Sequence, residues 1–176
     1  MDIAILAAAR FPIREPFAGG MEVHTHVLAD ALHRRGHTVT VYAADGAGPY
    51  RVRKMLALDF EASPGARRDV SAGPDSALAE HHSYLDAVLH LARSDHQIVH
   101  INAVHHLPFA CAGLLTHSVV TATLHTPPTP WLESALAIGA AAGTVPSMVS
   151  VSAANADAWS PLRLDGVIHN LSLIHI

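Results

Sequence analysis

The amino-acid sequence predicts an α/β fold in which a mainly parallel sheet carries helices on both faces, making a three-layer sandwich. Short apolar runs alternate along the chain with longer amphipathic stretches. Such alternation is typical of parallel strands joined by crossover helices. The short runs are also apolar without a break, as in strands covered on both faces. Because such crossovers are right-handed, we expect every strand-to-helix loop at one edge of the sheet, where ligands bind.

The first 44 residues predict a strand, a helix and a second strand. Residues 3–8 form the first apolar run, and residues 38–43 form the next. Between them we expect a helix from Gly20 to Arg35 that ends at Gly36, since glycine commonly follows a helix. The apolar stripe of this helix is predicted to consist of Val23, Val27, Leu28, Ala31 and Leu32.

The rest of the chain continues the alternation after an irregular segment. Residues 45–74 are rich in Gly, Pro, Arg and Ala, which favours loop structure, with one short strand near 52–58. Further helices are predicted at 75–93, 107–116, 131–142 and 153–159, and further strands at 97–101, 119–124, 147–151 and 166–169. The strand positions expected to be buried are Ile3, Ile5, Val39, Val41, Val99, Ile101, Val120, Ala122, Val149 and Val151.

Composition argues against several classes of function. Half of the 176 residues are apolar, so a disordered protein is not expected. The net charge of −4 argues against a general nucleic-acid surface, which needs clustered Lys and Arg. The single cysteine, Cys111, leaves no internal disulfide and no Cys-pair zinc site. The apolar start at residues 3–9 is too short for a membrane helix or signal peptide, so we expect a cytoplasmic protein.

Gly19 and Gly20 stand where the first loop becomes a helix. A helix N-terminus presents unpaired N–H groups and about half a positive charge. Glycines let a ligand approach the backbone closely, so this place suits a phosphate or a sugar hydroxyl. The dinucleotide fingerprint G-x-G-x-x-G is absent, which argues against an NAD enzyme. No G-x-S-x-G is present either, so a hydrolase elbow is not supported.

The opening segment resembles the N-terminal domain of family-4-type glycosyltransferases, which are retaining enzymes of the GT-B fold. The match consists of a strand, a long loop, Gly-Gly-x-Glu and a helix that ends in LADALHRRGHTVTVYA. The resemblance implies that residues 1–170 form a Rossmann-like, acceptor-side domain, the N-terminal half of a GT-B enzyme. Its later segments are Ile98-Val99-His100, Thr123-Leu124-His125, Val149-Ser150-Val151-Ser152 and Val167-Ile168-His169-Asn170.

The resemblance also implies substrates and site residues. The intact enzyme would use a nucleotide-sugar donor and an acceptor hydroxyl, with no cofactor and no catalytic metal. His125 follows a strand and is the candidate catalytic residue, because a His at this position contacts the reacting sugar or the acceptor in the resembling enzymes. Imidazole can hydrogen-bond a hydroxyl through either nitrogen near neutral pH. Gly19 and Gly20 are expected to lie against the donor phosphates or the acceptor.

Four further residues are candidates for substrate binding, and each also has a simpler structural explanation. Arg14, in the loop with Arg10, could meet an anionic group or simply face solvent. A carboxylate in the first turn, such as Glu22, is favoured by the helix dipole alone. His105 and His106 follow a strand and could line the cleft. With His100 they form a His-x4-His-His pattern, but no carboxylate lies close behind it, so we predict no metal site.

Glu22, His26 and Asp30 are spaced four residues apart along the first helix, and we interpret this stripe as a solvated face. Two other functions stay open: a standalone α/β module that binds a phosphate-bearing ligand without catalysis, and another nucleotide-using enzyme with a flavodoxin-like sheet. Peripheral membrane contact also stays open, because many relatives act on lipid-linked acceptors.

The last six residues, LSLIHI, depart from the family pattern. They resemble the translated start of a common sequencing adapter, so residues 171–176 are expected to be a non-native or truncated tail rather than a short native strand. The C-terminal donor domain of the family is then missing. Since half a cleft cannot bring donor and acceptor together, the chain alone is expected to be nearly inactive.

Overall fold

The computed structural model describes residues 1–55, 61–71 and 73–170. They form a seven-stranded sheet in the order β3-β2-β1-β4-β5-β6-β7, and every neighbouring pair is parallel. The predicted α/β class and the mainly parallel sheet are confirmed. The strands are β1 (Asp2–Leu6), β2 (Thr38–Ala43), β3 (Arg51–Lys54), β4 (Ile98–Ile101), β5 (Val119–Leu124), β6 (Ser147–Ser150) and β7 (Gly166–Val167).

Helices connect these strands in nearly the predicted places. They are α1 (Gly20–Arg34), α2 (Asp75–Leu91), α3 (Leu107–Ala110), α4 (Pro130–Ala142) and α5 (Ala153–Ala158), with short 3₁₀ turns η1 (Ala66–Arg68) and η2 (Ala112–Leu114). The helix predicted at 107–116 is instead α3 followed by η2. Gly113 lies inside that stretch, and glycine weakens a helix interior. The last parts of the predicted strand at 52–58, and the tail 171–176, lie outside the described residues.

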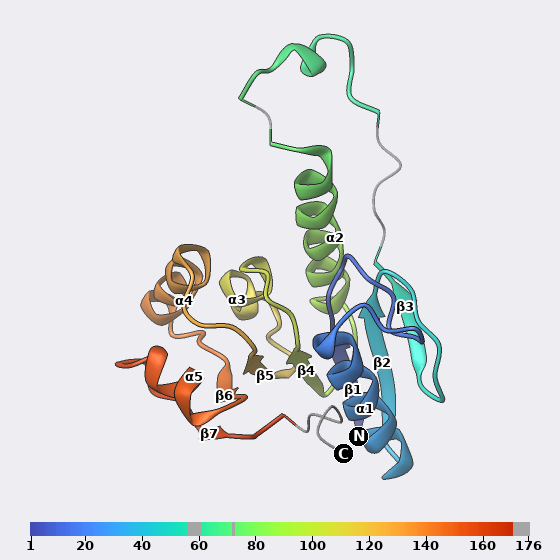
Figure 1. The fold of residues 1–176 in the computed structure, drawn as a ribbon, viewed down its shortest axis with the longest axis vertical. Coiled ribbons are helices and arrows are strands. Elements are labelled where there is room, and N and C mark those ends of the chain that lie inside the picture. The colour runs from blue at the N-terminus through green and yellow to red at the C-terminus, as the bar shows by residue number, and fades with distance from the viewer. Residues whose placement is uncertain (56–60, 72, 171–176) are drawn as a thin grey trace.

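The two faces of the sheet are covered by different helices (Figure 1). Ile3 and Ile5 of β1 pack on one face, in a cluster with Ala29 of α1. Ala4 and Leu6 point to the opposite face, because side chains alternate along a strand. The second face is packed against the buried residues of α2, and a third cluster joins β5 and β6 to α3, α4 and Trp159. The result is the predicted three-layer sandwich.

Burial of the strand residues follows the prediction except at three positions. Seven of the ten predicted core residues are buried, whereas Val120, Val149 and Val151 are half-buried. Val149 pairs with Thr123, which hydrogen-bonds to His100. The apolar cluster over β5 and β6 contains their neighbours Ala122 and Met148, so it lies on the other face. The prediction was wrong at β6 because an unbroken apolar run does not reveal which face is covered.

The buried face of α1 also differs from its predicted apolar stripe. The helix buries Glu22, Thr25 and Ala29, while Val27 is 43% exposed. The first turns of α1 therefore turn a polar face inward. Figure 1 shows α2 extending from the sheet toward the segment that contains η1, which stands away from the rest of the molecule.

The order of the strands defines where the chain reverses its path across the sheet. It passes from β1 to β2 and β3 on one side, and then returns to β4 on the other side of β1. Leu6 at the end of β1 pairs with Ile101 at the end of β4. The loops that leave these two strands must therefore diverge, which opens a crevice at the carboxyl ends of the strands.

Candidate functional site

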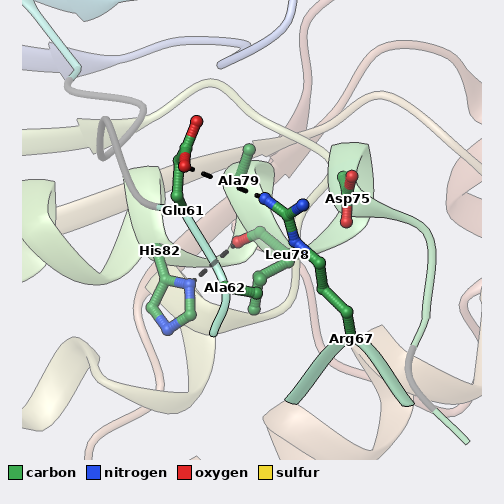
Figure 2. A pocket seen from close by; sticks show the side chains of 7 residues that line it. All are labelled: Glu61, Ala62, Arg67, Asp75, Leu78, Ala79 and His82. Atoms are coloured by element: carbon green, nitrogen blue, oxygen red, sulfur yellow. Dashed lines mark hydrogen bonds and ion pairs between the residues drawn. The ribbon is translucent and has the colours of Figure 1, made fainter. Parts of the chain in front are cut away.

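A hollow of about 800 Å³ lies between residues 61–67 and the first turns of α2 (Figure 2). Glu61 and Arg67 form an exposed ion pair of 3.9 Å there. His82 bonds to the backbone carbonyl of Leu78 at 3.0 Å, a contact inside one helix. Of the described residues that line this hollow, none follows a strand. Its side chains do not converge on a common point, so we do not place the site here.

A second cleft, of about 730 Å³, lies at the carboxyl ends of the strands. Its walls come from the loops after β1, β4 and β5, and from the starts of α1 and α2. The position is the crevice that the strand order predicts. Its lining residues include Arg10, Glu22, His81, Tyr84, His105, His106 and Trp131.

The structure brings three of the candidate residues to this cleft, namely Glu22, His105 and His106. Gly19 and Gly20 directly precede the wall formed by the first turn of α1. Arg14 is not one of the lining residues: its side chain is exposed and lies 3.5 Å from the Asp45 carboxylate.

Arg10, from the same loop as Arg14, lines the cleft instead, and its guanidinium lies 2.7 Å from the Glu80 carboxylate of α2. The charge of Arg10 is therefore already balanced by a carboxylate beside the cleft. Sequence reasoning grouped the two arginines because it could not tell which of them turns toward α2.

Glu22 and Gly19 are packed together at the start of α1. Glu22 is only 4% exposed. A Cβ atom added at Gly19 would lie 3.2 Å from Oε2 of Glu22, which is tighter than usual contact. Gly19 itself is in an extended conformation open to any residue. The absence of a side chain at Gly19 therefore makes room for the buried Glu22 carboxylate.

Gly20 has no such structural reason. A Cβ atom at Gly20 would meet nothing within 4 Å, and the residue does not have a positive φ. The open space beside its Cα lies at the positive end of a 15-residue helix. This is the geometry in which a bound anion or hydroxyl could approach the backbone.

We expect Gly20→Ala to leave the free energy of unfolding unchanged or to raise it by up to about 1 kcal/mol, because alanine favours the helical state. Gly19→Ala should lower it, since the new methyl group crowds Glu22. Urea unfolding of both variants checks the pair. The reverse order of stabilities would show that Glu22 does not occupy the space beside Gly19.

His125 lies in a polar network that ties β4, β5 and α1 together. Its Nε2 is 2.7 Å from Oδ1 of Asn102, which is fully buried. The Asn102 amide nitrogen donates to the Thr25 hydroxyl at 2.7 Å and lies 3.3 Å from Nδ1 of His24. Thr25 in turn donates to the Met21 carbonyl at 2.8 Å. Because Oδ1 of Asn102 can only accept, His125 must donate from Nε2 and therefore carries its proton there.

This arrangement determines what His125 can do. With Nε2 as the donor, Nδ1 of a neutral imidazole is an acceptor. No hydrogen bond from a described residue reaches His125 Nδ1. Burial, together with the neighbouring His24 and His100, lowers the pKa of His125 to about 4. The ring is therefore neutral at pH 7, with Nδ1 as its acceptor nitrogen, although His125 is not one of the residues that line the cleft.

Two more histidines surround His125. The His24 ring meets the His125 ring edge-on, with centroids 5.0 Å apart, and burial lowers the pKa of His24. His100 bonds to the hydroxyls of Thr121 and Thr123, at 2.8 and 3.1 Å. Burial and the neighbouring His24 lower the pKa of His100 to about 4.

The expectation that Glu22, His26 and Asp30 form a solvated face is wrong at Glu22, which is buried, and at His26, which is half-buried. The His26 Nδ1 lies 2.8 Å from the Tyr50 hydroxyl, and its ring packs against Phe17 and Tyr50. The spacing of Glu22, His26 and Asp30 places them along one side of the helix, but Phe17 and Tyr50 pack against His26 on that side.

One wall of the cleft is a row of stacked rings. Tyr84 stacks on His105 with centroids 4.5 Å apart, His105 on His106 at 4.3 Å, and His106 on Trp131 at 4.8 Å. The Tyr84 hydroxyl fixes one end, because it accepts from the Ala9 N–H and donates to the Ala7 carbonyl. Burial and the nearby His106 and His81 lower the pKa of His105 to about 4. Trp131 ends the row and is 70% exposed.

Sequence reasoning missed several residues of this site. His24 and Thr25 look like ordinary helix positions. His81 and Trp131 lie far along the chain from His105 and His106, which they contact. Only Asn102 carried a signal, since it follows a buried strand as His125 does. A search for polar residues directly after buried strands is the one sequence pattern that leads to this network, because it finds Asn102 and His125.

Comparison with known proteins agrees with this arrangement. The profile of Glycosyltransferase Family 4 matches residues 18–170. A search of curated proteins found no similar sequence. Among solved structures, sucrose-phosphate synthase from Thermosynechococcus elongatus has the same fold, with a TM-score of 0.56 and 15% identity. The similarity covers 95% of this chain and 47% of that protein, so the chain spans about half its length.

No helix among the described residues is both long and apolar enough to cross a membrane. The family profile covers Gly19, Gly20, every helix of the described residues and the strands β2 to β7, which is well over half of the chain. The chain therefore belongs to glycosyltransferase family 4.

Proposed function

We propose that this chain is the acceptor-side domain of a retaining glycosyltransferase, which moves a sugar from a nucleotide-sugar donor to an acceptor hydroxyl. The observation that carries the proposal is the state of His125. Its Nε2 is held by the buried Asn102 amide, its Nδ1 is the acceptor nitrogen of a neutral ring, and that ring meets His24 of α1 edge-on. The membership of family 4 supports the reaction class.

In this proposal the donor diphosphate and the sugar hydroxyl bind to different parts of the domain. The N–H groups and the partial positive charge at the start of α1 favour the diphosphate of the donor. His125 accepts a hydrogen bond from a sugar hydroxyl and holds it in place. Such a site accelerates transfer by positioning the reactants and by stabilising the leaving diphosphate with fixed dipoles.

The rest of the donor site belongs, in this proposal, to a second domain. The chain spans 47% of the sucrose-phosphate synthase structure. The resemblance to the family implies that most donor contacts come from a C-terminal domain. We expect the nucleotide sugar to be a co-substrate with no cofactor needed, and the reaction to take place in the cytoplasm. The 176-residue chain should then bind ligands weakly and transfer little sugar.

The test is a transfer assay with a panel of nucleotide sugars, run on the 176-residue chain and on a longer protein that adds a second α/β domain. Nucleotide release and sugar transfer are expected only from the longer protein, and NMR of the product should show the anomeric configuration of the donor. Inversion would contradict the retaining reaction. Phosphate-ligand binding by the chain, with no transfer by either protein, would favour a binding module instead.

Gly20→Val provides a second test of the same proposal. The two extra methyl groups fill the space in front of the helix N-terminus, where a Cβ atom meets nothing in the free protein. We expect the melting temperature to stay within a few degrees of the wild type, while kcat/KM for the donor falls by up to about 100-fold. An unchanged kcat/KM would show that the ligand does not approach Gly20.

A further inference from the structure

Three histidines meet at the wall of the cleft, although they are far apart in the sequence. His81 comes from the first half of α2, and His105 and His106 come from the loop after β4. Each of the three offers one ring nitrogen, and these nitrogens all lie within 4.8 Å of one another. All three side chains are half-buried, which distinguishes them from histidines scattered over a surface.

We propose that His81, His105 and His106 form a binding site for one transition-metal dication of the Zn²⁺ type. Neutral imidazole is a ligand that Zn²⁺, Cu²⁺ and Ni²⁺ accept readily, whereas Mg²⁺ prefers oxygen. Three protein ligands leave one position of a tetrahedral site open, here to the cleft. This inference does not depend on glycosyl transfer, because it rests on the three side chains alone.

The free structure already brings the ligands close to the distances that a metal needs. Zn–N bonds of about 2.0–2.1 Å place the nitrogens of a tetrahedral site roughly 3.3 Å apart. The observed limit is 4.8 Å, so the nitrogens have to approach one another by about 1.5 Å at most. Tyr84, three residues after His81 on α2, hydrogen-bonds to the backbone of Ala7 and Ala9 after β1, so this part of α2 is held in place.

Metal binding must change the row of stacked rings. His105 and His106 lie nearly parallel, at 23°, and a metal cannot lie in the planes of two stacked rings at once. His105 Nδ1 also accepts the Leu107 N–H at 3.2 Å, so ligation through that nitrogen would displace this bond. His106 should therefore turn, and its contact with Trp131 should change.

Trp131 is thus a built-in reporter of the site. Its ring stacks on His106 at 4.8 Å, whereas the other tryptophan, Trp159, is buried in the core. Adding Zn²⁺ to the metal-free chain should change the tryptophan fluorescence until one equivalent is bound. Trp131→Phe should remove most of that change without removing the binding of Zn²⁺.

The binding itself is measured by competition between the chain and a chromophoric chelator. We expect one saturable Zn²⁺ site per chain and no competition from Mg²⁺. His81→Gln and His106→Gln should each weaken the affinity for Zn²⁺ by about tenfold or more. His82→Gln is the matched control, because it lies next to His81 on α2, outside the cluster, and it should bind Zn²⁺ as the wild type does.

The chain contains 15 histidines, so weak binding elsewhere has to be separated from this site. Equal Zn²⁺ affinity of the wild type and a His81→Gln/His106→Gln double variant would overturn the proposal. A wild-type fluorescence signal that does not respond to one equivalent of Zn²⁺ would overturn it as well. The second readout needs no histidine variant, so it decides the matter even if the double variant does not fold.

Discussion

Replacing His125 with alanine is expected to lower sugar transfer by the intact enzyme on the order of 100-fold. The Nδ1 acceptor of His125 is lost, and with it the group proposed to hold the reacting hydroxyl. An interaction made mainly in the transition state lowers kcat when it is removed. The measurement is kcat and KM for transfer from each accepted nucleotide sugar, next to a thermal melt of each variant.

The same substitution should affect stability only moderately. Asn102 Oδ1 loses the donor at 2.7 Å, which costs about 1–3 kcal/mol if no water replaces it. His33→Ala is the control, because His33 is exposed in the last turn of α1. His26→Ala does not serve this purpose, since His26 bonds to Tyr50. Wild-type turnover in His125→Ala would show that this strand end does not meet the reacting groups.

Acid should destabilise the domain well before its carboxylates are protonated. His100, His105 and His125 each have a pKa lowered to about 4, with burial as the main cause. An unfolded His has a pKa of about 6.5. Between these values the unfolded chain binds more protons than the folded one, so the free energy of unfolding falls as the pH drops from about 6.5 to 4. Above pH 6.5 these histidines contribute no pH dependence.

His100 should account for a large share of this effect. A shift from about 6.5 to about 4 corresponds to roughly 3 kcal/mol for one group. We expect the difference in unfolding free energy between pH 7 and pH 5 to shrink in His100→Gln, whose side chain can still bond to Thr121 or Thr123. Urea unfolding across this pH range checks it, with His33→Gln as the control. If the difference in unfolding free energy between pH 7 and pH 5 were the same in wild type and His100→Gln, His100 would be protonated at pH 5 in the folded state.

The fold could be predicted because its causes are local. Apolar runs of four to six residues define β1, β2, β4, β5 and β6, and the amphipathic stretches between them define the major helices. Gly36 follows α1 with a φ of 83°, a conformation that favours glycine, so the end of that helix is also a local property. Short parallel strands then place Gly20, Asn102 and His125 at one edge without any knowledge of side-chain packing.

What the tertiary structure decided is which side chains meet at that edge. Asn102 joins Thr25 across 77 residues of sequence, His81 reaches His105 and His106 from another helix, and Arg10 rather than Arg14 turns into the cleft. The tertiary structure also decided which face of β6 stays half-buried. Periodicity within one element says which residues share a face. The partner of that face is determined only when elements distant in sequence pack together, so the sequence alone determined the place of the site and the tertiary structure its composition.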